Sequence, residues 1–118
     1  YGDDAAHVAR ARHELGIDII DDPDIDQLRD LDGLAAQIAA MDHVVTISNT
    51  TAHLAGALGV PATVLLPRDR GLHWYWFVDR PDSPWYPSLT LLRQSVSGQW
   101  GDVVDSAAQR LNGQRRGF

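Results

Sequence analysis

A cluster of small polar residues that could bind a ligand lies where an apolar run ends in the middle of the chain. The cluster consists of Ser48, Asn49, Thr50 and Thr51. If a helix begins here, its first backbone N–H groups have no partner inside the helix and lie at the positive end of its dipole. Such a corner can bind an anion, and diphosphate suits it best. The same residue types are also ordinary helix caps, so a capped corner and an anion site both remain open.

His53 follows one turn into the expected helix, where its imidazole could contact a phosphate or donate to a backbone carbonyl. His43, His53 and His73 stand on three separate elements without zinc-site spacing, so we assign no metal ligand. The glycine patterns of dinucleotide folds and P-loops are absent, as is a nucleophile elbow. The spacing therefore assigns no catalytic residue.

A second group with binding potential is aromatic. Residues 73–88 carry three of the four tryptophans and two of the three tyrosines, and prolines stiffen the segment. Rings on a stiff loop suit stacking against a base or a sugar, but they can equally form a small core at the sheet edge. For Trp85 and Tyr86 we favour the structural interpretation. For Trp74 and Trp76 both interpretations stay open.

The elements that must position these residues alternate between helix and strand. We expect helices at about 5–15, 32–41, 50–58 and 103–113, β-rich runs at 17–20, 43–48, 62–66 and 89–92, and an irregular segment at 68–88. Gly16 should close the first helix, and Asp3 and Asp4 should cap it. The alternation predicts an α/β fold, a Rossmann-like parallel sheet with helices on both faces. Ligands of such sheets bind beyond the carboxyl ends of the strands, which is where the polar cluster stands.

Composition limits the classes of function. The chain has 118 residues, 44% hydrophobic and 22% charged, which fits one soluble domain. It has no apolar run of the roughly 20 residues that cross a bilayer. A net charge of −6 argues against binding nucleic acid or a membrane surface. The absence of cysteine fits the cytoplasm, and the start at Tyr1 indicates a piece of a longer protein.

Three longer segments carry a family resemblance: "SNTTAHLAGALGVPATVLLP", "RPDSPWYPSLTLLRQ" and "GQWGDVV". Together they resemble glycosyltransferases related to the heptosyltransferases, most of all the glycosyltransferase region at the C-terminus of bacterial TPR-repeat proteins. The resemblance implies the GT-B fold, in which two Rossmann-like domains face each other across a cleft. Residues 1–113 would then be most of the second, donor-binding domain, and 114–118 a flexible tail.

The resemblance also implies a ligand for the polar cluster. The diphosphate of a nucleotide-sugar donor would lie at Asn49, Thr50 and Thr51, beside Ser48 and His53, and no other cofactor would be required. This chain has Ser48-Asn49 where many relatives have Asp-Thr, and Trp74-Tyr75-Trp76 where they often have Trp-Arg-Trp. Contacts made by those residues in the family are thus in doubt. The expected secondary donor contacts are Arg68, Arg70, Trp74 and Trp76, with Arg80 as a further substitute.

In that family, the catalytic base and the acceptor-binding site would lie in an N-terminal domain that this chain lacks. We therefore expect the donor-binding half of a glycosyltransferase, inactive alone, whose partners are a nucleotide sugar and that missing domain or a TPR region. The alternative is a non-catalytic interaction or scaffold domain derived from such a protein. Without the missing strands, 17–20 and 43–48 would expose edges, which predicts a homodimer or a rearranged edge. A receiver-type phosphate sensor is disfavoured because the chain has no lysine.

Overall fold

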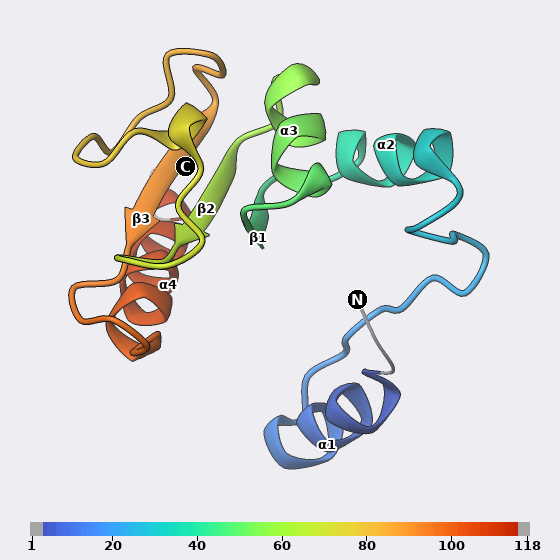
Figure 1. The fold of residues 1–118 in the computed structure, drawn as a ribbon. Helices are drawn as coiled ribbons and strands as arrows, with labels where there is room; N and C mark the ends of the chain where they lie inside the picture. The colour runs from blue at the N-terminus through green and yellow to red at the C-terminus, as the bar shows by residue number, and fades with distance from the viewer. Residues whose placement is uncertain (1–3, 116–118) are drawn as a thin grey trace.

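The structure of this protein is a computed structural model that describes residues 4–115 (Figure 1). Its helices are α1 (Ala5–Leu15), α2 (Leu31–Ala39), α3 (Thr50–Ala57) and α4 (Gly101–Arg115), and η1 (Trp74–Trp76) is a 3-10 turn. Its strands are β1 (Val44–Ile47), β2 (Ala62–Leu66) and β3 (Leu89–Arg93).

The strands form one parallel sheet in the order β1-β2-β3. Val44 lies opposite Ala62, and Ala62 lies opposite Leu89, so the three strands begin at one level. Helix α3 makes the crossover from β1 to β2, whereas the crossover from β2 to β3 is the long segment that contains η1. The predicted α/β class and parallel pairing are confirmed at this level.

Alternating side chains of the central strand divide the interior into two layers. Ala62, Val64 and Leu66 are buried in one core with residues of α2 and α3, among them Ile38 and Ala55. Residues between them, such as Thr63, point to the other face. That face is covered by α4, which contacts β2 and β3 and buries Val103 and Ala107. Helices therefore cover both faces, as the apolar strands indicated.

Small residues let α3 approach the segment before β3. A Cβ atom built on Gly56 would lie 2.4 Å from Cγ of Tyr86, far inside van der Waals contact. Tyr86 itself packs against the main core. The glycine therefore sets the close packing of α3 against this ring.

Several expectations about the chain ends need correction. Residues 17–20 form no strand, and they lie with α1 away from the sheet (Figure 1). Helix α4 continues past Gly113 to Arg115, into the expected tail, because the last turn has no proline and a single glycine weakens a helix without ending it. Asp4 stands at the N-cap of α1 but makes no side-chain cap bond, while Asp3 lies outside the described residues. Gly16 does close α1, in the left-handed conformation with φ of 61°.

None of the helices within residues 4–115 combines the length and the hydropathy that crossing a bilayer requires.

Candidate functional site

The corner between β1 and α3 is a capped helix start. Asn49 has an extended backbone, and its side-chain oxygen accepts a hydrogen bond from the Ala52 backbone N–H at 3.2 Å. The same oxygen accepts from the Thr46 hydroxyl at 3.0 Å. Asn49 therefore acts as the N-cap of α3, and its acceptor atom is used inside the fold.

Ser48 is joined to the aromatic segment rather than left open. Its Oγ accepts a hydrogen bond from the indole Nε1 of Trp76 at 2.9 Å. Trp76 is only 2% exposed and belongs to the main core. The structure thus places Trp76, one of the predicted donor contacts, directly against the corner, but as a buried packing residue.

His53 lies in an aromatic cluster. Its Nδ1 is 3.1 Å from the hydroxyl of Tyr86, and its ring stacks on Trp76 with centroids 5.1 Å apart. Tyr75 approaches edge-on, also at 5.1 Å. The imidazole therefore connects α3 to the aromatic segment, which is a packing role.

Thr50 and Thr51 are the corner residues that keep free donors. They are the first residues of α3, and neither their backbone N–H groups nor their hydroxyls have a hydrogen-bond partner within residues 4–115. Thr50 is exposed and Thr51 is half-buried. The part of the corner still able to meet an anion is thus two adjacent N–H groups with two hydroxyls.

The other predicted contacts do not converge on the corner. Arg68 donates to the carbonyl of Ser95 and lies 3.9 Å from the Asp69 carboxylate, so it faces the segment after β3. Arg70 is exposed. Trp74 is 77% exposed and packs edge-on against Trp85. Within the described chain, no hydrogen bond or ring contact joins these three predicted residues to Ser48, Asn49, Thr50 or Thr51.

The aromatic segment is held by a residue that sequence reasoning missed. The guanidinium of Arg93, at the end of β3, donates to the carbonyls of Trp76 at 2.6 Å, Phe77 at 3.1 Å and Arg80 at 2.5 Å. Phe77 has φ of 60°, a conformation that non-glycine residues rarely adopt. Burial lowers the pKa of Arg93 from its ordinary value. An arginine ending an apolar strand gave no signal of this role.

Ser83 stabilises the turn before β3. Its Oγ accepts from the backbone N–H groups of Trp85 and Tyr86, both at 3.2 Å. Tyr86 packs on the core, as the structural interpretation required. Trp85 remains 53% exposed, although its indole N–H donates to the Tyr75 carbonyl at 3.0 Å. Asp82, in the same turn, forms an ion pair with Arg80 at 2.8 Å.

The outer edge of β1 is a second candidate surface. The Val44 backbone N–H donates to the Pro61 carbonyl, which turns the peptide groups of Val44 and Thr46 toward β2. The N–H and C=O groups of Val45 and Ile47 therefore point away from the sheet, and they have no partner in residues 4–115. The Val45 and Ile47 side chains are 45% and 55% exposed. The edge thus combines free backbone groups with uncovered apolar side chains.

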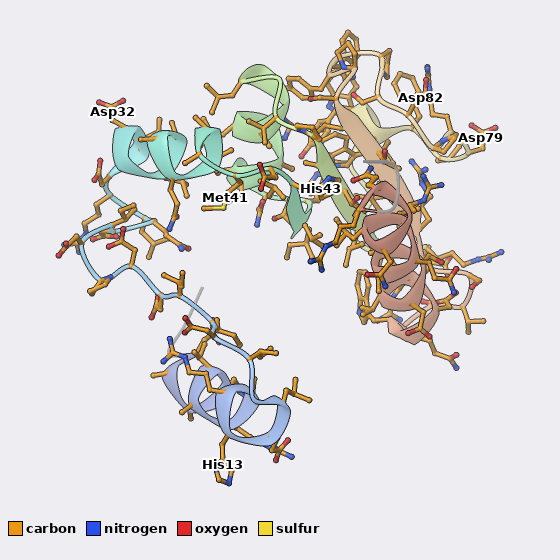
Figure 2. The ribbon with its side chains drawn as sticks, turned by 180° about the vertical axis from the view of Figure 1, so that it is seen from behind. His13, Asp32, Met41, His43, Asp79 and Asp82 are labelled. Atoms are coloured by element: carbon orange, nitrogen blue, oxygen red, sulfur yellow. The ribbon has the colours of Figure 1, made fainter. Side chains whose placement is uncertain are left out.

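An open groove of about 1150 Å³ lies between the start of β1 and the end of α4. Met41, His43 and Pro61 form one side, and Leu111 and Arg115 form the other. The Nε2 atom of His43 is 2.9 Å from the Thr63 hydroxyl, while its buried Nδ1 has no hydrogen-bond partner among residues 4–115. Burial lowers the pKa of His43 below its ordinary value. Figure 2 shows Met41 and His43 near each other and well separated from His13 on α1.

Among the described residues, no group of three or more histidine, aspartate or glutamate side chains is arranged to hold a metal ion.

Comparison with known proteins gives one named relative and no family. The chain is similar to Protein FlbA of Caulobacter vibrioides, with 36% identity over 115 residues. The match covers 94% of this chain but only 18% of FlbA, so the chain spans less than a fifth of that relative. No protein-family model matches the chain, and no solved structure matches it significantly.

These findings correct the family identification. The relative bears a different name, FlbA, and no glycosyltransferase family model matches. The identification as a GT-B glycosyltransferase of the TPR-associated type is therefore wrong. The description of the chain as a transferase, which depended on that identification, is wrong too. The anion site now depends on the chemistry of the corner alone.

Proposed function

We propose that this chain is a non-catalytic assembly domain, a small α/β unit whose β1 edge accepts a strand from another polypeptide. One observation carries the proposal: Val45 and Ile47 present backbone groups that have no partner within residues 4–115, together with side chains that are 45% and 55% exposed. In strand addition, the backbone bonds supply affinity and the alternating side chains supply specificity.

The sequence of β1 supports this use of the edge. Sheet edges that must stay unpaired are commonly protected by lysine, proline, a bulge or a covering element. The β1 strand reads Val-Val-Thr-Ile and contains none of these residues. Its outer edge is also left uncovered by α1, which lies away from the sheet (Figure 1). An unprotected apolar edge is what an assembly surface needs.

The corner offers further support, since three of its polar side chains are engaged within the fold. Ser48 accepts from Trp76, Asn49 caps α3, and His53 contacts Tyr86.

The parallel sheet is compatible with a Rossmann-like arrangement. We propose a cytoplasmic location because the chain has no cysteine.

Amide hydrogen exchange together with sedimentation velocity tests the assembly function. A particle heavier than 13.0 kDa with protected Val45 and Ile47 amides would support it. A monomer would also support it if its Val45 and Ile47 amides exchange fast and it binds a hydrophobic dye. The double variant Val45→Lys/Ile47→Lys should then lose the dye signal. The matched control is Val96→Lys, an exposed valine outside the sheet. A monomer with protected Val45 and Ile47 amides would overturn the proposal, because the chain would then cover its own edge.

A second candidate function is favoured by the free donors of Thr50 and Thr51 at the carboxyl end of β1. We propose that a nucleoside diphosphate, alone or within a nucleotide sugar, is the ligand that these donors would take. Two N–H groups at a helix start and two hydroxyls match the oxygens of a phosphate.

Titration with UDP, GDP and ADP, followed by amide chemical shifts, tests this second candidate. We expect shifts concentrated in residues 48–53, and binding weakened about tenfold or more in Thr50→Ala/Thr51→Ala. Ser106→Ala on α4 serves as the control for a lost exposed hydroxyl. Unchanged spectra with all three nucleotides at millimolar concentration would contradict it, without affecting the assembly function.

A further inference from the structure

The described chain contains an unpaired segment that resembles a strand as well as an unpaired edge. Residues 17–20 read Ile-Asp-Ile-Ile, and Ile17 and Ile20 are 48% and 85% exposed. Their backbone N–H groups have no partner in residues 4–115, although Arg12 Nε donates to the Ile19 carbonyl at 2.9 Å. β-branched residues with free backbone donors favour pairing with a strand.

Helix α1, which leads into this segment, also lacks a packing surface. None of its residues is buried, and Leu15 is 67% exposed. A helix of 11 residues is marginal in water without tertiary packing. Helix α1 and the strand-like segment 17–20, together called the helix–strand unit, have no sheet to pack on within residues 4–115.

The outer edge of β1 lacks a neighbouring strand among residues 4–115. β1 and the segment 17–20 each have four residues, and Val45 and Ile47 lie on the sheet face where α4 packs against β2 and β3. Gly16, in the left-handed conformation, turns the chain sharply between α1 and 17–20. The unit can therefore lay its strand beside β1 while α1 folds back over Val45 and Ile47, next to α4.

We propose that two copies of this chain exchange this unit, so that residues 17–20 of each copy pair in parallel with β1 of the other. The proposal rests on the assembly function proposed above and names its partner. Exchange of an identical element is a low-cost route to a symmetric dimer.

The connection to α2 favours a second copy over closure within one chain. Five carboxylates lie in nine residues, namely Asp18, Asp21, Asp22, Asp24 and Asp26. Charges of one sign repel and keep a linker extended. Helix α2 packs against α3 and leads away from the sheet, so 17–20 lies beyond its far end (Figures 1 and 2). Exchange leaves this linker extended, whereas closure would fold it back on itself.

Charge complementarity selects the parallel direction. In a parallel pair, the acidic residues from Asp21 onward reach the carboxyl end of the other copy's β1. There α3 begins with the free N–H groups of Thr50 and Thr51, and the positive end of a helix dipole stabilises nearby carboxylates. A register with Ile17 opposite Val45 and Ile19 opposite Ile47 puts all four apolar side chains on the face under α1.

Engineered cysteines test this register without background, since the chain has no cysteine of its own. Neighbouring strands lie about 4.8 Å apart, within the range that a disulfide spans. Under mild oxidation, Ile17→Cys/Val45→Cys should give a covalent dimer whose linked peptides contain positions 17 and 45. The control Ile17→Cys/Val78→Cys carries a cysteine at a more exposed valine of the aromatic segment and should give no such linkage. A bridge within one chain, or no bridge between 17 and 45, would overturn the exchange.

Mass and amide exchange of the unmodified chain separate this inference from the function on which it rests. Exchange of the unit predicts a dimer with protected amides in both α1 and β1, and a monomer for Ile17→Asp/Ile19→Asp. A monomer with open β1 amides would overturn the exchange but leave β1 available to another polypeptide. A monomer with protected β1 amides would overturn both.

Discussion

The indole N–H of Trp76 donates a hydrogen bond to Ser48 Oγ at 2.9 Å, which ties the aromatic segment to the corner between β1 and α3. Trp76 is 2% exposed, so no water can readily replace the serine. We expect Ser48→Ala to lower the free energy of unfolding by about 1–3 kcal/mol, because a buried donor is left without an acceptor. Urea denaturation measures the change, and Ser106→Ala on the exposed face of α4 should differ from wild type by less than about 0.5 kcal/mol.

Gly56 allows a second test of packing. A methyl group there would lie 2.4 Å from Tyr86 Cγ, so Gly56→Ala should destabilise the protein by about 1–3 kcal/mol despite the better helix propensity of alanine. Gly113 is the matched control, since a Cβ atom there meets nothing within 4 Å. Gly113→Ala should stabilise by up to about 1 kcal/mol. Equal effects at the two glycines, measured by thermal or urea unfolding, would contradict the packing of α3 on Tyr86.

Much of the fold followed from the pattern of residues, and the departures have physical causes. Strand 62–66 was predicted at its observed bounds because it is apolar on both faces and ends at a proline. The run at 17–20 has strand propensity too, yet propensity does not supply a neighbouring strand, and the described chain places none beside it.

The corner shows the limit of spacing as a guide to function. Asn49 has a capping residue's sequence signature, and the structure confirms the cap. Nothing in the sequence shows that Ser48 and His53 meet aromatic residues 28 and 33 positions away. Contacts between distant segments depend on the tertiary arrangement, so some of the residues predicted to bind a ligand have structural roles. The same reason explains why Arg93 was missed.

Arg93 should control the order of the aromatic segment. Its guanidinium donates to three backbone carbonyls, at Trp76, Phe77 and Arg80. Arg93→Met leaves these acceptors unpaired, and we expect a loss of about 1–3 kcal/mol together with faster amide exchange in 76–82. Arg93→Lys should recover only part of the loss, since one ammonium cannot reproduce the planar fork. Arg70→Met, at an exposed arginine, is the control, and similar effects at both positions would refute the role of Arg93.

His43 should make stability depend on pH. Burial lowers its pKa in the folded protein below the ordinary value of 6.5, so at intermediate pH the unfolded chain binds a proton that the folded chain does not. The contribution is therefore present above about pH 6.5, decreases as the pH falls toward the lowered folded pKa, and then levels off. Urea midpoints across this range measure it. His43→Gln should flatten this part of the profile, and an unchanged slope would show that another group causes it.

Helix α1 has no buried residue and so adds almost nothing to cooperative unfolding of the single chain. Heat uptake at the transition scales with the number of residues that melt together, at about 0.7 kcal/mol per residue near 60 °C. A dilute sample should therefore melt with the enthalpy of a chain that starts near Leu31. If copies exchange their helix–strand units, a concentrated sample would melt with a larger enthalpy per chain, so calorimetry would detect the association as a change in the size of the melting unit.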